Sequence, residues 1–596
     1  MIRKVFRQMT ATQIASAAMV TVCLLTDNII IARFLGVEAV SAYGLANPVL
    51  IMFTAQGTVL VCGIQVLTGR AMGRGDMKAC GRCFSTSAVM ALVMTVLWML
   101  AIFLFTDPIC YFLGTGIPSE ENSIFIMTSA YLRGFFAFAP FFFLSQIMIP
   151  YLQIMAERKR AVAAVIVLTV SDIVLDLVSI FVFHAGMLGI GVAAGLSYMA
   201  AFLVGAFPFF RKDSLFRFDP GDVDVRMMPL ISRSGSTIAV NQTSFTIRVY
   251  LINRMLLALS GSVAVAAFTV ISTTSNLIGS IGLGAGSVTL LLASLFYSEE
   301  DRTSLYELMR GMVPYTLKLI LAAVITCEAA APLLMRLFLG KEPQALPTAV
   351  AGFRICLPAL AAGVLVTVLK NYYQGTGRVK FTNLISLCDN VLITVPAAWL
   401  LSRIMGVNGV WTGIMIAPYL VLLMISLIVW SKNGRAAFTA EAYSLLRPDF
   451  GADPSDVFVL SVTDMASAIG ASEEINGFCA GKGLGSRLSM LVSLCVEEVT
   501  VNIIEHGFTK DDLPHSADVR LVVNDDRCII RIRDNCVSFD PLSYIELHSS
   551  DDPASHVGIR MVTAMVSEIN YMNSLGLNNL YMKLDRDQNP IDKVGK

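Results

Sequence analysis

The chain has 596 residues, of which 55% are hydrophobic and only 15% are charged. Soluble domains carry about 25% charged residues, so the composition excludes an ordinary soluble protein and indicates a helical integral membrane protein. Basic and acidic residues number 44 each. Because the net charge is zero, the chain has no bulk attraction to nucleic acid, and we expect no nucleic-acid partner. Membrane lipid is an expected partner instead.

The first apolar segment, residues 11–36, holds a carboxylate near its middle, at Asp27. The segment is long enough to cross a bilayer, because ~20 residues at ~1.5 Å each cover ~30 Å. An ionisable group at that depth costs at least ~2.5 kcal/mol, so it usually faces a polar cavity, a partner or a transported ion. We interpret Asp27 as functional and its neighbour Asn28 as a candidate cavity residue. The alternative is a satisfied structural aspartate near a helix end.

About twelve apolar segments of spanning length precede residue 432. The loops between them alternate between basic and nearly uncharged sequences, and Lys370 is counted with the basic loops. The positive-inside rule places the basic loops, and both termini, in the cytoplasm. The expected segments are 11–36, 41–67, 83–106, 124–150, 161–183, 187–210, 230–258, 263–293, 311–335, 348–370, 381–402 and 407–430.

The membrane part contains an internal repeat. Short matches recur in order, with an offset that drifts from 225 residues (261 − 36) to 218 (413 − 195). Each half holds about six segments, and an even number means that the halves are parallel repeats. We therefore predict lobes at 1–220 and 221–432 that rock around a central cavity. The matches are Gly36–Tyr43 with Gly261–Phe268, Arg74–Asp76 with Glu299–Asp301, Tyr151–Gln153 with Tyr372–Gln374, and Gly191–Gly195 with Gly409–Gly413.

The fifth segment adds two carboxylates, Asp172 and Asp176, which are four residues apart and share one helix face. Three charged carboxylates in hydrocarbon would be strongly unfavourable, so a proton or another cation should sit among them. A transporter driven by H⁺ or Na⁺ needs such groups. The alternative for Asp172 is a water-exposed position near the cytoplasmic end. The corresponding place in the second lobe holds Asp389 and Asn390, so the first lobe is the more acidic.

Other polar residues lie in the apolar body. Amide side chains there often join helices, and they can also line a cavity. An arginine on the seventh segment could pair with a carboxylate or with an anionic substrate. The candidate cavity residues are Gln56, Gln153, Arg248 and Gln374.

The membrane part resembles the multidrug and toxic compound extrusion (MATE) family. The resemblance covers residues 5–435 and is carried by the repeat and by Asp27, Phe34–Ala39, Asn47-Pro48, Tyr151–Gln153 and Asn371–Arg378. It implies that Asp27 and Asp176 match the first-lobe carboxylates of that family, on helices one and five. Asp172 stands where an asparagine is often seen. The resemblance implies export of organic, cationic compounds driven by H⁺ or Na⁺.

After Trp430 the composition becomes that of a soluble protein. We predict a cytoplasmic linker at 433–455 and an α/β sandwich domain at 456–596. Alternating and helical patterns predict strands at Val457–Val462, Asp518–Val523, Cys528–Arg533 and Asn579–Leu584, with helices at Thr463–Ala480 and Ser486–Glu505.

Three motifs in this domain carry the chemistry. Glu498, Asn502 and His506 are spaced by four and share a helix face, Asp534 follows a strand, and Gly558 opens a helix. In this order they resemble the boxes of GHKL-type ATP-binding domains, most closely the anti-sigma-factor serine kinases. The resemblance implies that Asn502 holds Mg²⁺, Glu498 is the catalytic base, Asp534 reads adenine and Gly558 begins the phosphate lid.

The last two boxes depart from the GHKL pattern. Cys536 stands where a glycine is expected, and the last box has one glycine instead of two. A side chain there would keep the backbone farther from a nucleotide. A degenerate domain that keeps the fold and binds a protein partner is therefore the alternative to an active one.

We expect a secondary active exporter of small molecules in a prokaryotic plasma membrane, with ATP and Mg²⁺ bound by its cytoplasmic domain. A different class is a membrane-anchored signalling protein whose tail phosphorylates an anti-anti-sigma-like partner. A third candidate is a lipid-linked flippase, which should expose a lateral cationic groove.

Overall fold

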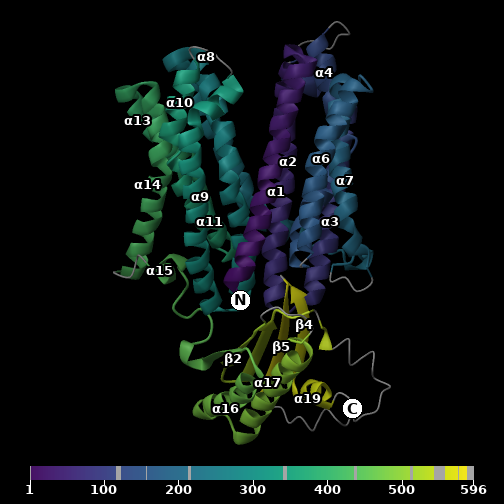
Figure 1. Cartoon of the computed structure of the whole chain (residues 1–596), viewed down its shortest axis with the longest axis vertical. Coiled ribbons are helices and arrows are strands. Elements are labelled where there is room, and N and C mark those ends of the chain that lie inside the picture. Colours follow the sequence, from purple (N-terminus) through teal and green to yellow (C-terminus); the bar gives the residue numbers. More distant parts are fainter. Residues whose placement is uncertain are drawn as a thin grey trace.

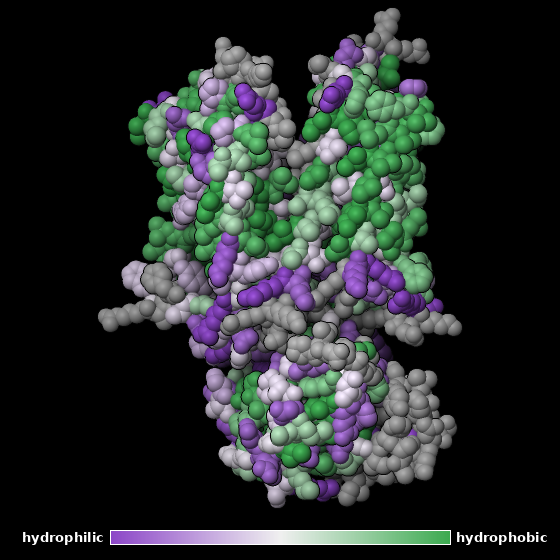
Figure 2. Space-filling model, viewed as in Figure 1, coloured by the Kyte–Doolittle hydropathy of each residue, from purple (hydrophilic) through white to green (hydrophobic). Residues whose placement is uncertain are grey.

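The computed structural model describes residues 2–113, 115, 122–155, 157–211, 216–339, 345–434, 439–509, 515–537, 539–541, 557–574 and 576–586. Two bundles of long helices stand side by side, and a smaller domain of strands and helices lies against one end of them (Figure 1). A broad apolar surface covers the bundles, while the smaller domain has mixed polarity (Figure 2). The bundles therefore match a body that sits in a bilayer.

Each bundle is built from one half of the repeat. The first holds α1 (Ile2–Ile30), α2 (Val37–Gly73), α3 (Met77–Leu113), α4 (Ser123–Phe136), α5 (Ala139–Ile154), α6 (Arg158–Phe181) and α7 (Gly186–Ala206). The second holds α8 (Met227–Ser298), α9 (Arg302–Leu339), α10 (Ala345–Cys356), α11 (Ala359–Gly375), α12 (Val379–Leu387), α13 (Thr394–Met405) and α14 (Val407–Asn433).

The number of membrane-crossing helices agrees with the expected fold. Among the described residues, eight helices are long and apolar enough to cross a membrane, and the number reaches ten if two bent pairs, α4–α5 and α10–α11, each form one span. Two further helical segments complete the bundles. α1 belongs to the first, and the part of α8 before its break at Ser260 and Gly261 belongs to the second. Together these account for the predicted segments.

The repeat extends to backbone detail. Gly36 and Gly261 both have positive φ, as do Gly75 and Glu300, and both pairs are 225 residues apart. The bends of the two helix pairs, which the sequence did not predict, measure 50° and 48°. Gln13 Nε2 donates to Gln153 Oε1 at 2.7 Å, and Gln374 Nε2 donates to the Ser234 carbonyl oxygen at 3.1 Å. These bonds join equivalent helices in the two lobes.

The lobes meet at a seam between α2 and α8, where glycines allow the two helix backbones to approach closely. A Cβ on Gly63 would collide with the carbonyl oxygen of Ile231, and one on Gly235 would collide with that of Val59. Farther along α2, a Cβ on Gly73 would collide with the Ser298 hydroxyl and with the carbonyl oxygen of Leu295. The seam closes the end of the body nearest the smaller domain, whereas the far end is hollowed between the lobes (Figure 2).

The C-terminal domain is a five-stranded antiparallel sheet in the order β1-β2-β3-β5-β4. The predicted strands and helices are present. The sequence reading missed β4, whose polar and aromatic residues do not alternate cleanly. The elements are β1 (Val457–Val462), α16 (Met465–Gly481), α17 (Ser486–His506), β2 (Ala517–Val523), β3 (Arg527–Asp534), α19 (Val557–Met565), β4 (Glu568–Ser574) and β5 (Leu577–Asp585).

The segment predicted as a linker is held to the second lobe. It contains the short helix α15 (Ala440–Ser444). Arg302, at the start of α9, donates to the carbonyl oxygen of Phe450 at 3.1 Å from Nε. The Phe450 ring stacks on Tyr297 with 4.8 Å between centroids. The described part of the connection is therefore anchored to the body.

The seam predicts opposite effects for two alanine substitutions in α8. Alanine favours a helix over glycine by about 1 kcal/mol, so Gly279→Ala, which meets open space, should keep or raise the melting temperature. Gly235→Ala should lower it, because the new Cβ meets the backbone of α2 and overpacking costs about 1–3 kcal/mol. Thermal unfolding of both variants in detergent checks this, and equal melting temperatures would contradict the seam.

Candidate functional site

Three buried carboxylates come together in the first lobe. Asp27 lies on α1 and is 7% exposed, while Asp172 and Asp176 lie on α6 and are 5% and 1% exposed. The Asp27 carboxyl group lies close enough to Asp172 and Asp176 to interact electrostatically with both. Asp172 is therefore buried in this cluster and does not occupy the water-exposed position that was its alternative.

The cluster has few donors of its own. Ser197 Oγ donates to Asp172 Oδ1 at 3.1 Å. No N–H or O–H group of the described residues donates to Oδ1 of Asp27 or to either oxygen of Asp176. A hydrogen bond between two carboxyl groups requires a proton on one of them, and buried charges without partners are costly. The arrangement is thus suited to hold a proton.

The second lobe carries basic side chains on the helix that corresponds to α1. Arg248 lies on the first half of α8, which is the helix that corresponds to α1, and α1 carries Asp27. The Arg248 guanidinium lies 4.8 Å from the centroid of the Phe245 ring and interacts electrostatically with Asp389. The two lobes therefore present opposite charges from corresponding helices.

Lys370 is a functional candidate whose position was predicted wrongly from the sequence. The charge pattern assigns it to a basic cytoplasmic loop, but it lies within α11 and is only 9% exposed. Its Nζ donates to Asn241 Oδ1 at 2.7 Å, and Asn390 Nδ2 approaches the same oxygen at 3.4 Å. Because α11 continues to Gly375, Lys370 lies within the helix and not in the loop that follows it.

The remaining candidate cavity residues are joined to neighbouring helices. Trp98 Nε1 donates to Gln56 Oε1 at 3.0 Å. Gln153 and Gln374 make the equivalent interhelical bonds described above. These contacts fit the interpretation that the glutamine side chains join neighbouring helices. The side chain of Asn28 lies outside the described residues.

In the C-terminal domain, one face of α17 carries the first predicted motif. Asn502 Nδ2 donates to the Glu498 carbonyl oxygen at 2.7 Å, which turns its Oδ1 away from the helix. Glu498 and Asn502 are half-buried and His506 is exposed. A Cβ on Gly558 would collide with Glu498 Oε2, so α19 begins directly against this face. The first and last motifs are thus brought together.

Asp534 lies at the end of β3 and is 5% exposed. Its Oδ1 accepts from the Cys536 backbone N–H at 2.9 Å and from Asn578 Nδ2 at 2.7 Å. Burial raises the pKa of Asp534 above its usual range, although the bonds from Asn578 and Cys536 oppose that shift. Asn578, on β5, was not found from the sequence because no motif surrounds it.

The unexpected Cys536 is accommodated by a neighbouring glycine. A Cβ on Gly507 would lie 2.9 Å from Cys536 Sγ, so the thiol fills the space that a side chain at Gly507 would occupy. The described residues of the domain thus fit a nucleotide with Mg²⁺ in two respects. The Asn502 oxygen is oriented outward as a magnesium ligand requires, and a buried carboxylate ends β3.

Comparison with protein families places both parts of the chain. The MatE family model matches residues 13–178 and again 238–400, which together make more than half of the chain. The chain belongs to the MatE family. Its two matched stretches correspond to the two lobes, which confirms the internal repeat. Residues 461–584 match the histidine kinase-like ATPase domain, so a GHKL-type domain is fused to the transporter, and this domain type points to nucleotide binding.

Similar proteins and structures agree with this assignment. The multidrug export protein MepA of Staphylococcus saprophyticus is 21% identical over 421 residues, covering 68% of this chain and 89% of MepA. MepA of Staphylococcus haemolyticus is 22% identical over 413 residues, covering 68% and 88%.

Among solved structures, an outward-facing multidrug resistance MATE transporter of the MOP superfamily has a TM-score of 0.66 at 20% identity, covering 71% of this chain and 94% of that one. A MATE in the bent conformation has a TM-score of 0.64 at 21% identity, covering 75% and 97%. At this identity, these structures establish the fold of the membrane part.

The environment of Asp534 predicts how nucleotide binding depends on pH. A carboxylate that accepts from adenine loses this role when protonated. Because burial raises the pKa of Asp534, affinity should begin to fall at a higher pH than an ordinary aspartate would give. Asp534→Asn should weaken binding about tenfold or more and remove this pH dependence. Titration of the full-length protein with a fluorescent ATP analogue at several pH values checks both effects, with Asp518→Asn as control.

Proposed function

We propose that the protein is a proton-driven exporter of organic compounds. The observation that carries the proposal is the burial of Asp27, Asp172 and Asp176 within electrostatic reach of one another in the first lobe. Protons bound by these carboxyl groups remove negative charge from the cluster, and their loss leaves a negative site for a cationic cargo. The printed names of the MepA relatives, which are multidrug export proteins, support export of more than one compound.

The exchange of protons for cargo follows from the charge of the carboxylate cluster. When the outer cleft is open, protons enter and occupy the carboxylates, which lowers their attraction for a bound cation and releases it outward. When the cytoplasmic side opens, the cluster loses its protons and accepts cargo again. The protein would lie in a prokaryotic plasma membrane with both termini in the cytoplasm, so that an inward proton gradient drives export.

The second lobe favours a second cargo chemistry. Arg248 and Lys370 place two cations beside a single carboxylate, Asp389, where the first lobe has acids. Such a site attracts a carboxylate or phosphate group, so compounds that carry both charges fit the pair of lobes. A lipid-linked flippase would use the same cations. Lys370→Gln should then weaken export of anionic or zwitterionic compounds and spare simple organic cations.

The C-terminal domain would bind ATP with Mg²⁺ held by Asn502, and Glu498 would act as base if the domain transfers phosphate. A cytoplasmic protein of the anti-anti-sigma type would then be the acceptor. Phosphate transfer to a serine or threonine of such a partner, lost in Asn502→Ala, tests this role. Nucleotide binding without transfer would leave the domain as a regulator of the transporter.

Asp27→Asn and Asp176→Asn should each abolish gradient-driven export, because an amide cannot exchange a proton. Reconstituted vesicles with an imposed H⁺ gradient or an imposed Na⁺ gradient provide the measurement, with accumulation of a fluorescent organic cation as readout. Asp107→Asn, at an exposed site that pairs with Arg133, is the matched control and should transport normally. Transport that is driven by the Na⁺ gradient but not by the H⁺ gradient would contradict proton coupling and identify Na⁺ as the coupling ion.

A further inference from the structure

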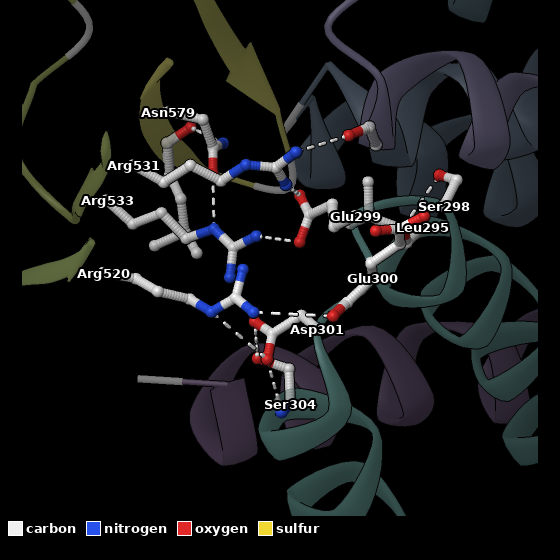
Figure 3. Close-up of polar contacts among 12 residues, drawn as sticks. Leu295, Ser298, Glu299, Glu300, Asp301, Ser304, Arg520, Arg531, Arg533 and Asn579 are labelled. Carbon is white, nitrogen blue, oxygen red and sulfur yellow. Dashed lines mark hydrogen bonds and ion pairs between the residues drawn. The ribbon is translucent and has the colours of Figure 1, made fainter. Parts of the chain in front are cut away.

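Three arginines of the C-terminal domain point from one face of its sheet toward the membrane body (Figure 3). Arg520 lies on β2, and Arg531 and Arg533 lie two residues apart on β3. Residues two apart on a strand share a face. Ile530 and Ile532, on the other face, are buried in the core formed with the helices. The arginine face is therefore the one that meets the transporter.

The arginines contact both lobes. Arg531 Nη1 lies 2.8 Å from Glu299 Oε1 at the end of α8, and its Nη2 donates to the Gly73 carbonyl oxygen of α2 at 2.8 Å. A single guanidinium thus joins the second lobe to the first. Arg533 also pairs with Glu299, and Arg520 Nε lies 3.7 Å from Asp301 Oδ1.

These charges are shielded from water. The side chains of Arg520, Arg531 and Arg533 are 14%, 15% and 14% exposed, and those of Glu299 and Asp301 are 7% and 3% exposed. Burial alone would raise the pKa of Asp301, but Arg520 and Arg533 outweigh it, and the pKa is lowered. Separating the surfaces exchanges these ion pairs for hydrated charges, so the pairs and the bond from Arg531 to Gly73 have to be broken before the surfaces part.

The repeat explains why the arginines select the second lobe. The turn Glu299–Asp301 corresponds to Arg74–Asp76 in the first lobe, with positive φ at Glu300 and at Gly75. The aspartates cap the next helix alike, since Asp76 accepts from the Ala79 N–H and Asp301 from the Ser304 N–H. The first residue of the turn differs, because Arg74 stands where Glu299 stands. The second turn therefore offers two carboxylates to the arginines, Glu299 and Asp301, whereas the first turn has a basic residue beside its aspartate.

We propose that Arg520, Arg531 and Arg533 form a clamp that holds the two lobes together at their cytoplasmic ends. The clamp bridges the glycine seam where α2 and α8 end, and the cleft between the lobes lies at the opposite end (Figure 2). Opening toward the cytoplasm separates these helix ends, so it requires release of the clamp. The C-terminal domain thereby acts as a brake on alternating access.

The clamp can be tested with a native cysteine as reporter. Cys62, on α2, is buried in a small apolar cluster with Val66 and Leu290 across the seam. We expect a maleimide to reach it only when the seam opens. Glu299→Gln removes the partner of two arginines. Glu300→Gln is the matched control, because Glu300 lies in the same turn with an exposed side chain and contributes only its carbonyl oxygen, 3.5 Å from Arg520 Nη2.

In the full-length protein, Glu299→Gln should raise the rate of Cys62 labelling by N-ethylmaleimide about fivefold or more, while Glu300→Gln should match the unmodified protein. Peptide mass spectrometry measures the rate, and Cys80, buried in α3, should label equally in all variants. Equal Cys62 rates in Glu299→Gln and Glu300→Gln would overturn the clamp.

If Glu299→Gln does not fold, the double variant Arg531→Gln, Arg533→Gln provides the same test from the other side of the contact. A faster rate in the double variant supports the clamp, and an unchanged rate rejects it. The measurement needs no nucleotide, so it is independent of the proposed exchange of protons and of the ATP site.

Discussion

A charge inside an apolar medium has to be neutralised by something within reach, and this requirement shapes both lobes. In the first lobe, Asp27, Asp172 and Asp176 face one another, so neutralisation has to come from a mobile cation. In the second, Arg248 and Lys370 find Asp389 and the Asn241 amide. The repeat has thus kept its backbone while giving the two halves side chains of opposite charge, as the proposed exchange of protons for a cationic cargo requires of the first lobe.

The same backbone repeat was visible in the sequence because it depends on local chemistry. Glycines with positive φ at Gly36 and Gly261, and aspartates that cap at Asp76 and Asp301, recur as short matches. Hydrophobic length alone placed the spans. The bends between α4 and α5 and between α10 and α11 were not predicted, because each interrupts an apolar run without a change in polarity. Lys370 was misplaced for a related reason, since a basic residue near a span end normally belongs to a loop.

In the C-terminal domain the motif order predicted the family, and strand alternation predicted most of the sheet. The residues that contact these motifs could not be predicted, because they lie far from the motifs in the sequence. Asn578 binds Asp534 from β5, and Gly507 makes room for Cys536 from the end of α17. The docking face was equally hidden, since Arg520, Arg531 and Arg533 read as ordinary solvent-facing residues of an amphipathic sheet until their contacts with the body are seen.

Strand β3 ends with two neighbours that serve opposite sides of the sheet. Arg533 bonds to Asn579 at 2.9 Å and reaches the transporter, while Asp534 bonds to Asn578 at 2.7 Å on the face of the helices. In the ladder, Arg533 pairs with Asn579 and Asp534 with Asn578. One peptide unit therefore separates the two surfaces. A movement of that peptide unit would displace both side chains together.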